Sequence, residues 1–60
     1  MIKYKGYTLI YMALIKSYTI RFPEHIQKLL KISSLTTQYS LEQIIALIDI
    51  IERKIINEQP

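Results

Sequence analysis

Apolar and small polar side chains alternate along residues 17–22. The apolar positions are Tyr18, Ile20 and Phe22, and the polar positions are Ser17, Thr19 and Arg21. Successive side chains of a strand point to opposite faces, so this alternation predicts a strand with one apolar face and one hydrogen-bonding face. A lone strand leaves its backbone donors and acceptors unpaired and is not stable by itself.

The period changes after Pro23, which suits a first helical turn because its missing N–H would have no intrahelical partner there. Ile26, Leu29 and Leu30 recur at helical spacing, which predicts a helix over about residues 24–35. The segment "SSLTTQ" is poor in helix formers and is expected to end it.

A second helix is predicted over about residues 40–57. Ser40 and Gln43 have the spacing of a capping box, in which each side chain bonds the backbone N–H of the other residue. Its apolar stripe is too wide for one strand and one short helix to cover: Ile44, Ile45, Leu47, Ile48, Ile51, Ile55 and Ile56. We therefore expect a second copy of the chain to cover the remainder. Glu52 lies within the stripe, where we expect it at the rim, paired with a base, or solvated at a frayed helix end.

If the chain is a homodimer, residues 17–22 of two copies can pair as an antiparallel ribbon. The expected fold is then mainly α with one short strand per chain, in a strand-swapped homodimer. A two-stranded ribbon fits the major groove of B-DNA, and its outward polar side chains are of the kinds that contact base edges.

The composition argues against an enzyme. The chain has 60 residues, no cysteine and a single histidine, His25, which we expect on the surface of the first helical turn. So few groups offer neither a metal site nor a nucleophile with its base, and no cofactor is expected. A domain of this size buries only about 60% of its unfolded surface, so oligomerisation is the remaining way to enlarge the core.

Basic residues dominate the N-terminal third, where Lys3, Lys5, Lys16 and Arg21 precede the first acid, Glu24. An anionic partner is expected to bind there. Residues 1–15 are predicted to be a basic arm, with an added strand or a short helix as alternatives. Their apolar run is too short to span a bilayer and lacks a cleavage site, which favours a bacterial or viral cytoplasmic protein.

The stretch "YTIRFPEHIQKLLKISSLTTQYSLEQIIALIDIIERKI" resembles the ribbon-helix-helix DNA-binding proteins of the Arc and MetJ type. The resemblance covers residues 16–56 and implies a domain of residues 16–57, with a tail at 58–60. It implies a DNA-binding homodimer that represses transcription. The base-reading positions of the family fall on Ser17, Thr19 and Arg21, and its phosphate-binding helix N-terminus falls on Ser40 and Leu41. Lys3, Lys5 and Lys16 are expected to add phosphate contacts.

A different function class also fits the sequence. A small helical interaction module could lie on a membrane surface through Tyr4, Tyr7, Tyr11 and the N-terminal lysines, without DNA binding. Binding to bulk DNA or to anionic vesicles would distinguish the two classes.

Overall fold

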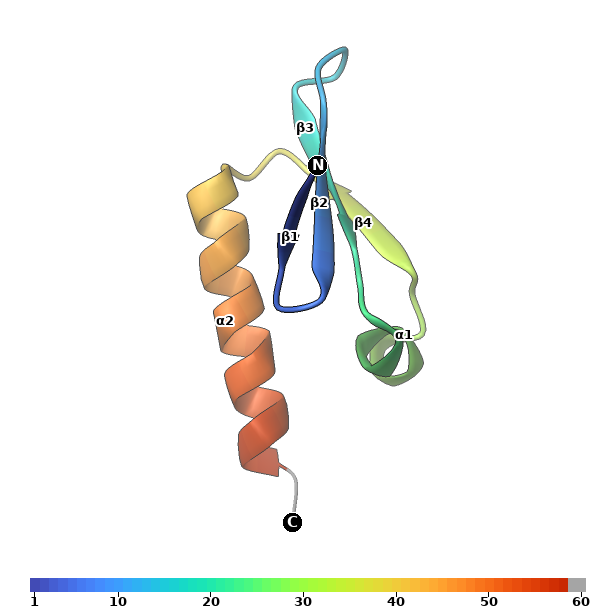
Figure 1. Cartoon of the computed structure of the whole chain (residues 1–60), viewed down its shortest axis with the longest axis vertical. Coiled ribbons are helices and arrows are strands. Elements are labelled where there is room, and N and C mark those ends of the chain that lie inside the picture. The colour runs from blue at the N-terminus through green and yellow to red at the C-terminus, as the bar shows by residue number, and fades with distance from the viewer. Residues whose placement is uncertain (59–60) are drawn as a thin grey trace.

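The computed structural model describes residues 1–58 as an antiparallel sheet of four strands with two helices. Along the chain the elements are β1 (Ile2–Tyr4), β2 (Tyr7–Met12), β3 (Ser17–Arg21), α1 (Glu24–Leu30), β4 (Ser34–Thr37) and α2 (Leu41–Glu58). The strands lie in the sheet in the order β1-β2-β3-β4, which is also their order in the sequence (Figure 1).

Two hairpins join the first three strands. Lys5 and Gly6 connect β1 to β2 with φ values of 50° and 86°, as a two-residue hairpin turn with positive φ at both positions requires. Residues 13–16 connect β2 to β3, and Lys16 closes that loop with a φ of 51°. Both turns thus depend on lysine in the left-handed region, where a non-glycine residue is uncommon.

The first helix is shorter than the sequence predicts. It begins after Pro23 and ends at Leu30, because Lys31 adopts a φ of 60° and donates its backbone N–H to the Gln27 carbonyl. This left-handed residue closes the helix and turns the chain back toward the sheet. The Phe22 N–H donates to the Ser33 carbonyl at 3.1 Å, so pairing of β4 with β3 begins just after this turn.

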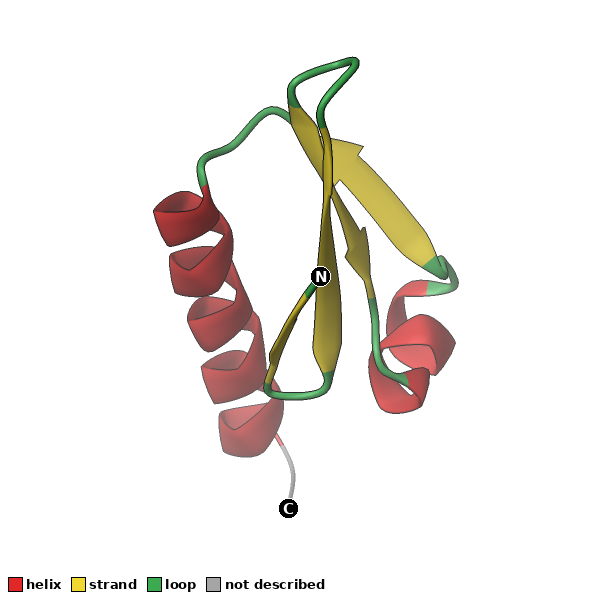
Figure 2. Ribbon diagram, turned by 45° about the horizontal axis from the view of Figure 1, so that its top comes forward, coloured by secondary structure: helices red, strands yellow, loops and turns green. Residues whose placement is uncertain are grey.

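The second helix confirms its prediction. Ser40 Oγ accepts the Gln43 N–H at 3.2 Å, and Gln43 Oε1 accepts the Ser40 N–H at 2.9 Å, which is the complete capping box. The helix runs along one face of the sheet, as Figure 2 shows. Within residues 1–58, neither helix combines the length and the apolar composition needed to cross a membrane.

The core lies between the sheet and the helices. Its buried members come from β2, β3, α1, α2 and the residue after β3: Tyr7, Leu9, Ile20, Phe22, Ile26, Ile44 and Ile48. Leu9 and Ile20 face each other across β2 and β3, and the Tyr7 and Phe22 rings meet edge to face at a centroid distance of 5.9 Å.

The predicted fold class is wrong. The chain is not mainly α with one short strand, because residues 2–12 and 34–37 add three further strands. The predicted strand-swapped ribbon is also wrong, because β3 is flanked by β2 and β4 of its own chain and has no free edge for a second copy. The sheet likewise buries Ile44 and Ile48 of the α2 stripe within one chain.

Residues 1–15 were expected to form an arm, an added strand or a short helix, and they contain β1 and β2. Tyr7 and Leu9 from this segment belong to the core. The segment is therefore an integral part of the sheet.

Candidate functional site

The face of the sheet away from α2 carries one polar row across all four strands. Lys3 is paired with Thr8, Thr8 with Arg21, and Arg21 with Ser34. Residues that face each other across an antiparallel ladder have side chains on the same side of the sheet, so these four lie side by side. Lys3, Arg21 and Ser34 are exposed, and Thr8 is half-buried. We call this face the open face.

A second row on the open face combines hydroxyl and apolar groups. Ile10 is paired with Thr19, and Thr19 with Thr36. The two threonine hydroxyls lie 3.0 Å apart and share a hydrogen bond, which leaves one of them free to donate outward. The two rows together present basic, hydroxyl and aliphatic groups on one surface.

The open face bears no negative charge. The sequence has no acidic residue in positions 1–23 or 25–41, so none of the four strands contains one. Three of the carboxylates on the helices have basic neighbours of their own: Asp49 pairs with Lys5 at 2.7 Å, Glu52 with His25 at 3.4 Å, and Glu24 with Lys28 at 3.4 Å. Lys3 and Arg21 have no carboxylate within 4.0 Å among the side chains that the structure describes.

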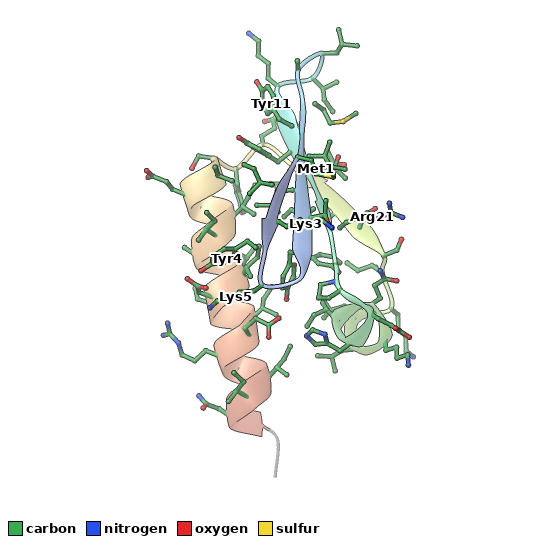
Figure 3. The ribbon with its side chains drawn as sticks, viewed as in Figure 1. Met1, Lys3, Tyr4, Lys5, Tyr11 and Arg21 are labelled. Atoms are coloured by element: carbon green, nitrogen blue, oxygen red, sulfur yellow. The ribbon has the colours of Figure 1, made fainter. Side chains whose placement is uncertain are left out.

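Lys5 lies on the other side of the sheet, where it helps to attach β1 to α2. Asp49 accepts hydrogen bonds from Lys5 Nζ at 2.7 Å and from the Tyr4 hydroxyl at 2.8 Å. These two bonds hold the pKa of the Asp49 carboxyl below its usual value. Figure 3 shows Tyr4 and Lys5 reaching α2, whereas Lys3 and Arg21 lie on the opposite side of the strands.

The structure separates the site residues that the sequence suggested. Thr19, Arg21 and Lys3 share the open face. Ser17 is only 4% exposed, and its hydroxyl donates to the Ile15 carbonyl at 3.0 Å. Its hydroxyl proton is therefore used inside the β2–β3 hairpin.

The other suggested phosphate contacts also lie apart from Arg21. Ser40 and Leu41 begin α2, which covers the opposite side of the sheet, and Leu41 packs against the core. Lys16 is exposed in the loop between β2 and β3.

Sequence reasoning missed three hydroxyl residues of the open face. Thr8, Ser34 and Thr36 join the face because β2 and β4 flank β3. The aromatic and β-branched residues of "YTLIYM" and the β-branched pair Thr36–Thr37 were the available signals.

A partly buried polar cluster contains Tyr7 of β2, His25 of α1 and Glu52 of α2. One of the alternatives from the sequence placed Glu52 beside a basic residue. In the structure, 17% of the Glu52 side chain is exposed and its Oε1 lies 3.4 Å from Nε2 of His25. The Tyr7 hydroxyl is buried and has no hydrogen-bond partner among the described residues. Burial, with a smaller effect of the nearby Glu52 carboxylate, raises the pKa of the Tyr7 phenol above its usual value.

The side chains of the open face offer positive charge and hydrogen-bonding groups. The Arg21 guanidinium offers a planar fork of donors, the Lys3 ammonium offers a mobile positive charge, and the hydroxyls both donate and accept. Comparison with protein-family models, with curated proteins and with solved structures found no match.

Proposed function

We propose that this chain binds double-stranded DNA through the open face of its sheet. The observation that carries the proposal is the row of Lys3, Thr8, Arg21 and Ser34, which crosses four strands that contain no acidic residue. Basic and hydroxyl side chains supply most protein contacts to DNA phosphates and base edges. Repression of transcription, implied by the sequence resemblance, stays a prediction.

The spacing of the strands relates the position of Lys3 to that of Arg21 on the DNA. Neighbouring strands lie about 4.8 Å apart, which places β1 roughly 10 Å from β3. The major groove of B-DNA is about 12 Å wide. When β3 lies over the base edges, Lys3 on β1 therefore comes close to one phosphate backbone.

The two basic residues then have different roles. Arg21 lies on the interior strand β3, where its fork can bond the O6 and N7 atoms of guanine together. Lys3 lies on the edge strand β1 and contacts phosphate, which gives affinity without sequence preference. Thr19 is next to Arg21 on the same face of β3 and can bond a base edge or contact the methyl group of thymine.

Duplex DNA is favoured over duplex RNA by the shape of the surface. The major groove of A-form RNA is deep and narrow, and side chains on a broad sheet cannot reach its base edges. The major groove of B-DNA is wide enough for side chains that project from the open face to reach base edges, so B-DNA is the better fit.

The test compares Arg21→Ala with Arg53→Ala. Both changes remove one guanidinium from an exposed position, but Arg53 lies on α2, away from the open face. Sites are first selected from a random pool of duplexes, and affinity for a selected site and for scrambled DNA is then measured at two salt concentrations. We expect Arg21→Ala to lower the preference for the selected site by roughly 1–3 kcal/mol. Arg53→Ala should leave that preference unchanged.

The salt dependence separates the two roles on the open face. Lys3→Ala should weaken binding to both DNAs alike and reduce the salt slope by about one unit. Equal losses for Arg21→Ala and Arg53→Ala would show that only net charge matters and would overturn the assignment of the open face. Binding to anionic vesicles with no binding to DNA would favour the membrane-surface alternative.

A further inference from the structure

The two edges of the sheet differ in how they are protected. Edge strands expose unpaired backbone groups, and proteins commonly guard them with short length, charge or proline. β1 has three residues, contains Lys3 and is followed by Lys5. β4 has the sequence SLTT, which contains neither a charge nor a proline. The β4 edge is therefore available for pairing with another strand.

The residues that bury the apolar side chains of β2 and β3 leave the apolar side chain of β4 exposed. Leu35 is the ladder partner of Ile20, and the two side chains share the side of the sheet that α2 covers. Ile20 is 1% exposed, whereas Leu35 is 45% exposed. Leu30 and Ile32, on the approach to β4, are exposed as well. The β4 edge thus combines a free backbone with an unburied apolar side chain.

We propose that β4 pairs with β4 of a second copy of this chain, antiparallel about a two-fold axis at Leu35. The result is one continuous sheet across both copies. This interface differs from the predicted ribbon of residues 17–22, which are interior in the sheet, and it does not depend on DNA binding.

The direction of the backbone groups supports this register. Because the Phe22 N–H donates to the Ser33 carbonyl, Ser33 faces β3 with its hydrogen-bonding groups, and so do Leu35 and Thr37 by alternation. Ser34 and Thr36 consequently direct their N–H and C=O groups to the free edge. With the axis at Leu35, Ser34 of one copy faces Thr36 of the other, and both pairs can exchange their hydrogen bonds.

The side chains match in the same register. Leu35 of one copy faces Leu35 of the other in a non-hydrogen-bonded pair, where side chains approach most closely. Both side chains lie on the side of the sheet that carries the helices. Ser34 and Thr36 meet on the open face, so hydroxyl faces hydroxyl. A shift by one residue would set Leu35 against Thr36 and join the helix side of one copy to the open face of the other.

The register predicts which cysteine variant forms a disulfide. The chain contains no cysteine, so each single variant adds one thiol. A non-hydrogen-bonded antiparallel pair has a Cα separation of about 4.5 Å, within the range of about 4.4–6.8 Å for disulfides. Under mild oxidation we expect Leu35→Cys to form a covalent dimer. Thr36→Cys should not, because its two Cα atoms would lie more than about 7 Å apart.

Ile2→Cys is the matched control. Ile2 lies on the other edge strand, on the same side of the sheet as Leu35, and is 40% exposed. If crosslinking depended only on random collisions, Ile2→Cys and Leu35→Cys would crosslink at similar rates. That result would overturn the proposal. Faster crosslinking of Thr36→Cys than of Leu35→Cys would overturn the proposed register.

Sedimentation equilibrium tests the association without crosslinking. The wild-type chain should show a dimer mass, and Leu35→Lys should raise the dimer dissociation constant by about tenfold or more, because like charges then meet at the axis. Ile2→Lys should leave the constant unchanged. If the wild-type chain keeps the monomer mass of 7.1 kDa up to about 1 mM, a concentration that detects even weak pairing, the proposal is overturned.

Discussion

At the scale of single residues, the buried Tyr7 hydroxyl is a weak point of the core. A buried hydroxyl without a partner costs roughly 1–3 kcal/mol relative to its hydrated state. The Tyr7 ring, by contrast, packs edge to face against Phe22 in the same core. The aromatic ring therefore stabilises the fold, and its oxygen does not.

Tyr7→Phe is expected to leave the free energy of unfolding unchanged or to raise it by up to about 1 kcal/mol, because it removes the oxygen and keeps the ring. Chemical denaturation of both proteins at the same concentration measures this. Tyr18→Phe is the control, since Tyr18 is only half-buried. A clear loss of stability in Tyr7→Phe would mean that the phenol donates a hydrogen bond to Glu52 in solution.

The residues of β3 show what alternation can and cannot predict. The two-residue period correctly groups Thr19 and Arg21 on one face. The same period includes Ser17, but Ser17 is buried and its hydroxyl donates to the Ile15 carbonyl in the loop of residues 13–16. A repeating pattern describes the strand, whereas the exposure of its first residue depends on a turn that the pattern does not contain.

Among the elements, α2 gives a direct test of capping. Ser40→Ala removes the acceptor of the Gln43 N–H and should lower the free energy of unfolding by about 1 kcal/mol. Because α2 covers the side of the sheet away from the open face, DNA affinity of the folded variant should be unchanged. Ser33→Ala, an exposed serine outside both helices, is the control. Weaker DNA binding by folded Ser40→Ala would support the phosphate contact at Ser40 that the sequence suggested.

The attachment of β1 to α2 should depend on pH. Asp49 has a lowered pKa in the folded chain, so its contribution to stability is present above its usual pKa and is lost as pH falls toward the folded value. Lys5 has a raised pKa, so its contribution is lost only at alkaline pH. We therefore expect Asp49→Asn to be less stable than wild type at neutral pH.

The two proteins should converge in acid. Melting temperatures measured from about pH 7 down to about pH 2, across the usual range of carboxyl titration, will show whether the difference disappears. Glu42→Gln, which changes an exposed carboxylate in the first turn of α2, is the control. A difference between Asp49→Asn and wild type that stays constant with pH would show that the carboxylate charge has no role.

Elements were predictable where their signals are local. The capping box and apolar stripe of α2 lie within a single segment, so its start at about residue 40 and its length follow from sequence. β4 was missed because hydroxyl-rich "SSLTT" resembles a loop, and its pairing with β3 depends on the left-handed turn at Lys31. The β1–β2 hairpin was missed because its turn, Lys5–Gly6, is not one of the Asn-Gly or Asp-Gly pairs that predict a hairpin strongly. Gly6 was the available signal.

At the scale of the whole molecule, the predicted partner of β3 was wrong for a physical reason. An alternating strand needs at least one neighbour to pair its backbone groups, and the sequence indicates this without identifying the neighbour. β2 is joined to β3 by a loop of only four residues, so its effective concentration at that edge is far higher than that of a second chain. Pairing within the chain is therefore favoured at β3, and the edge at which we propose pairing with a second copy is that of β4.

The matching order of the strands in the sheet and in the sequence has a consequence for how the chain folds. Each strand pairs with the next one along the chain, so no ladder has to wait for a distant segment. Proteins whose contacts are near in sequence fold quickly, because closing short loops costs little entropy. The hairpins of β1, β2 and β3 can thus form before α2 docks, and the self-capped α2 can form independently. We therefore expect the packing of α2 on the hairpins, over Tyr7, Ile44 and Ile48, to come late in folding.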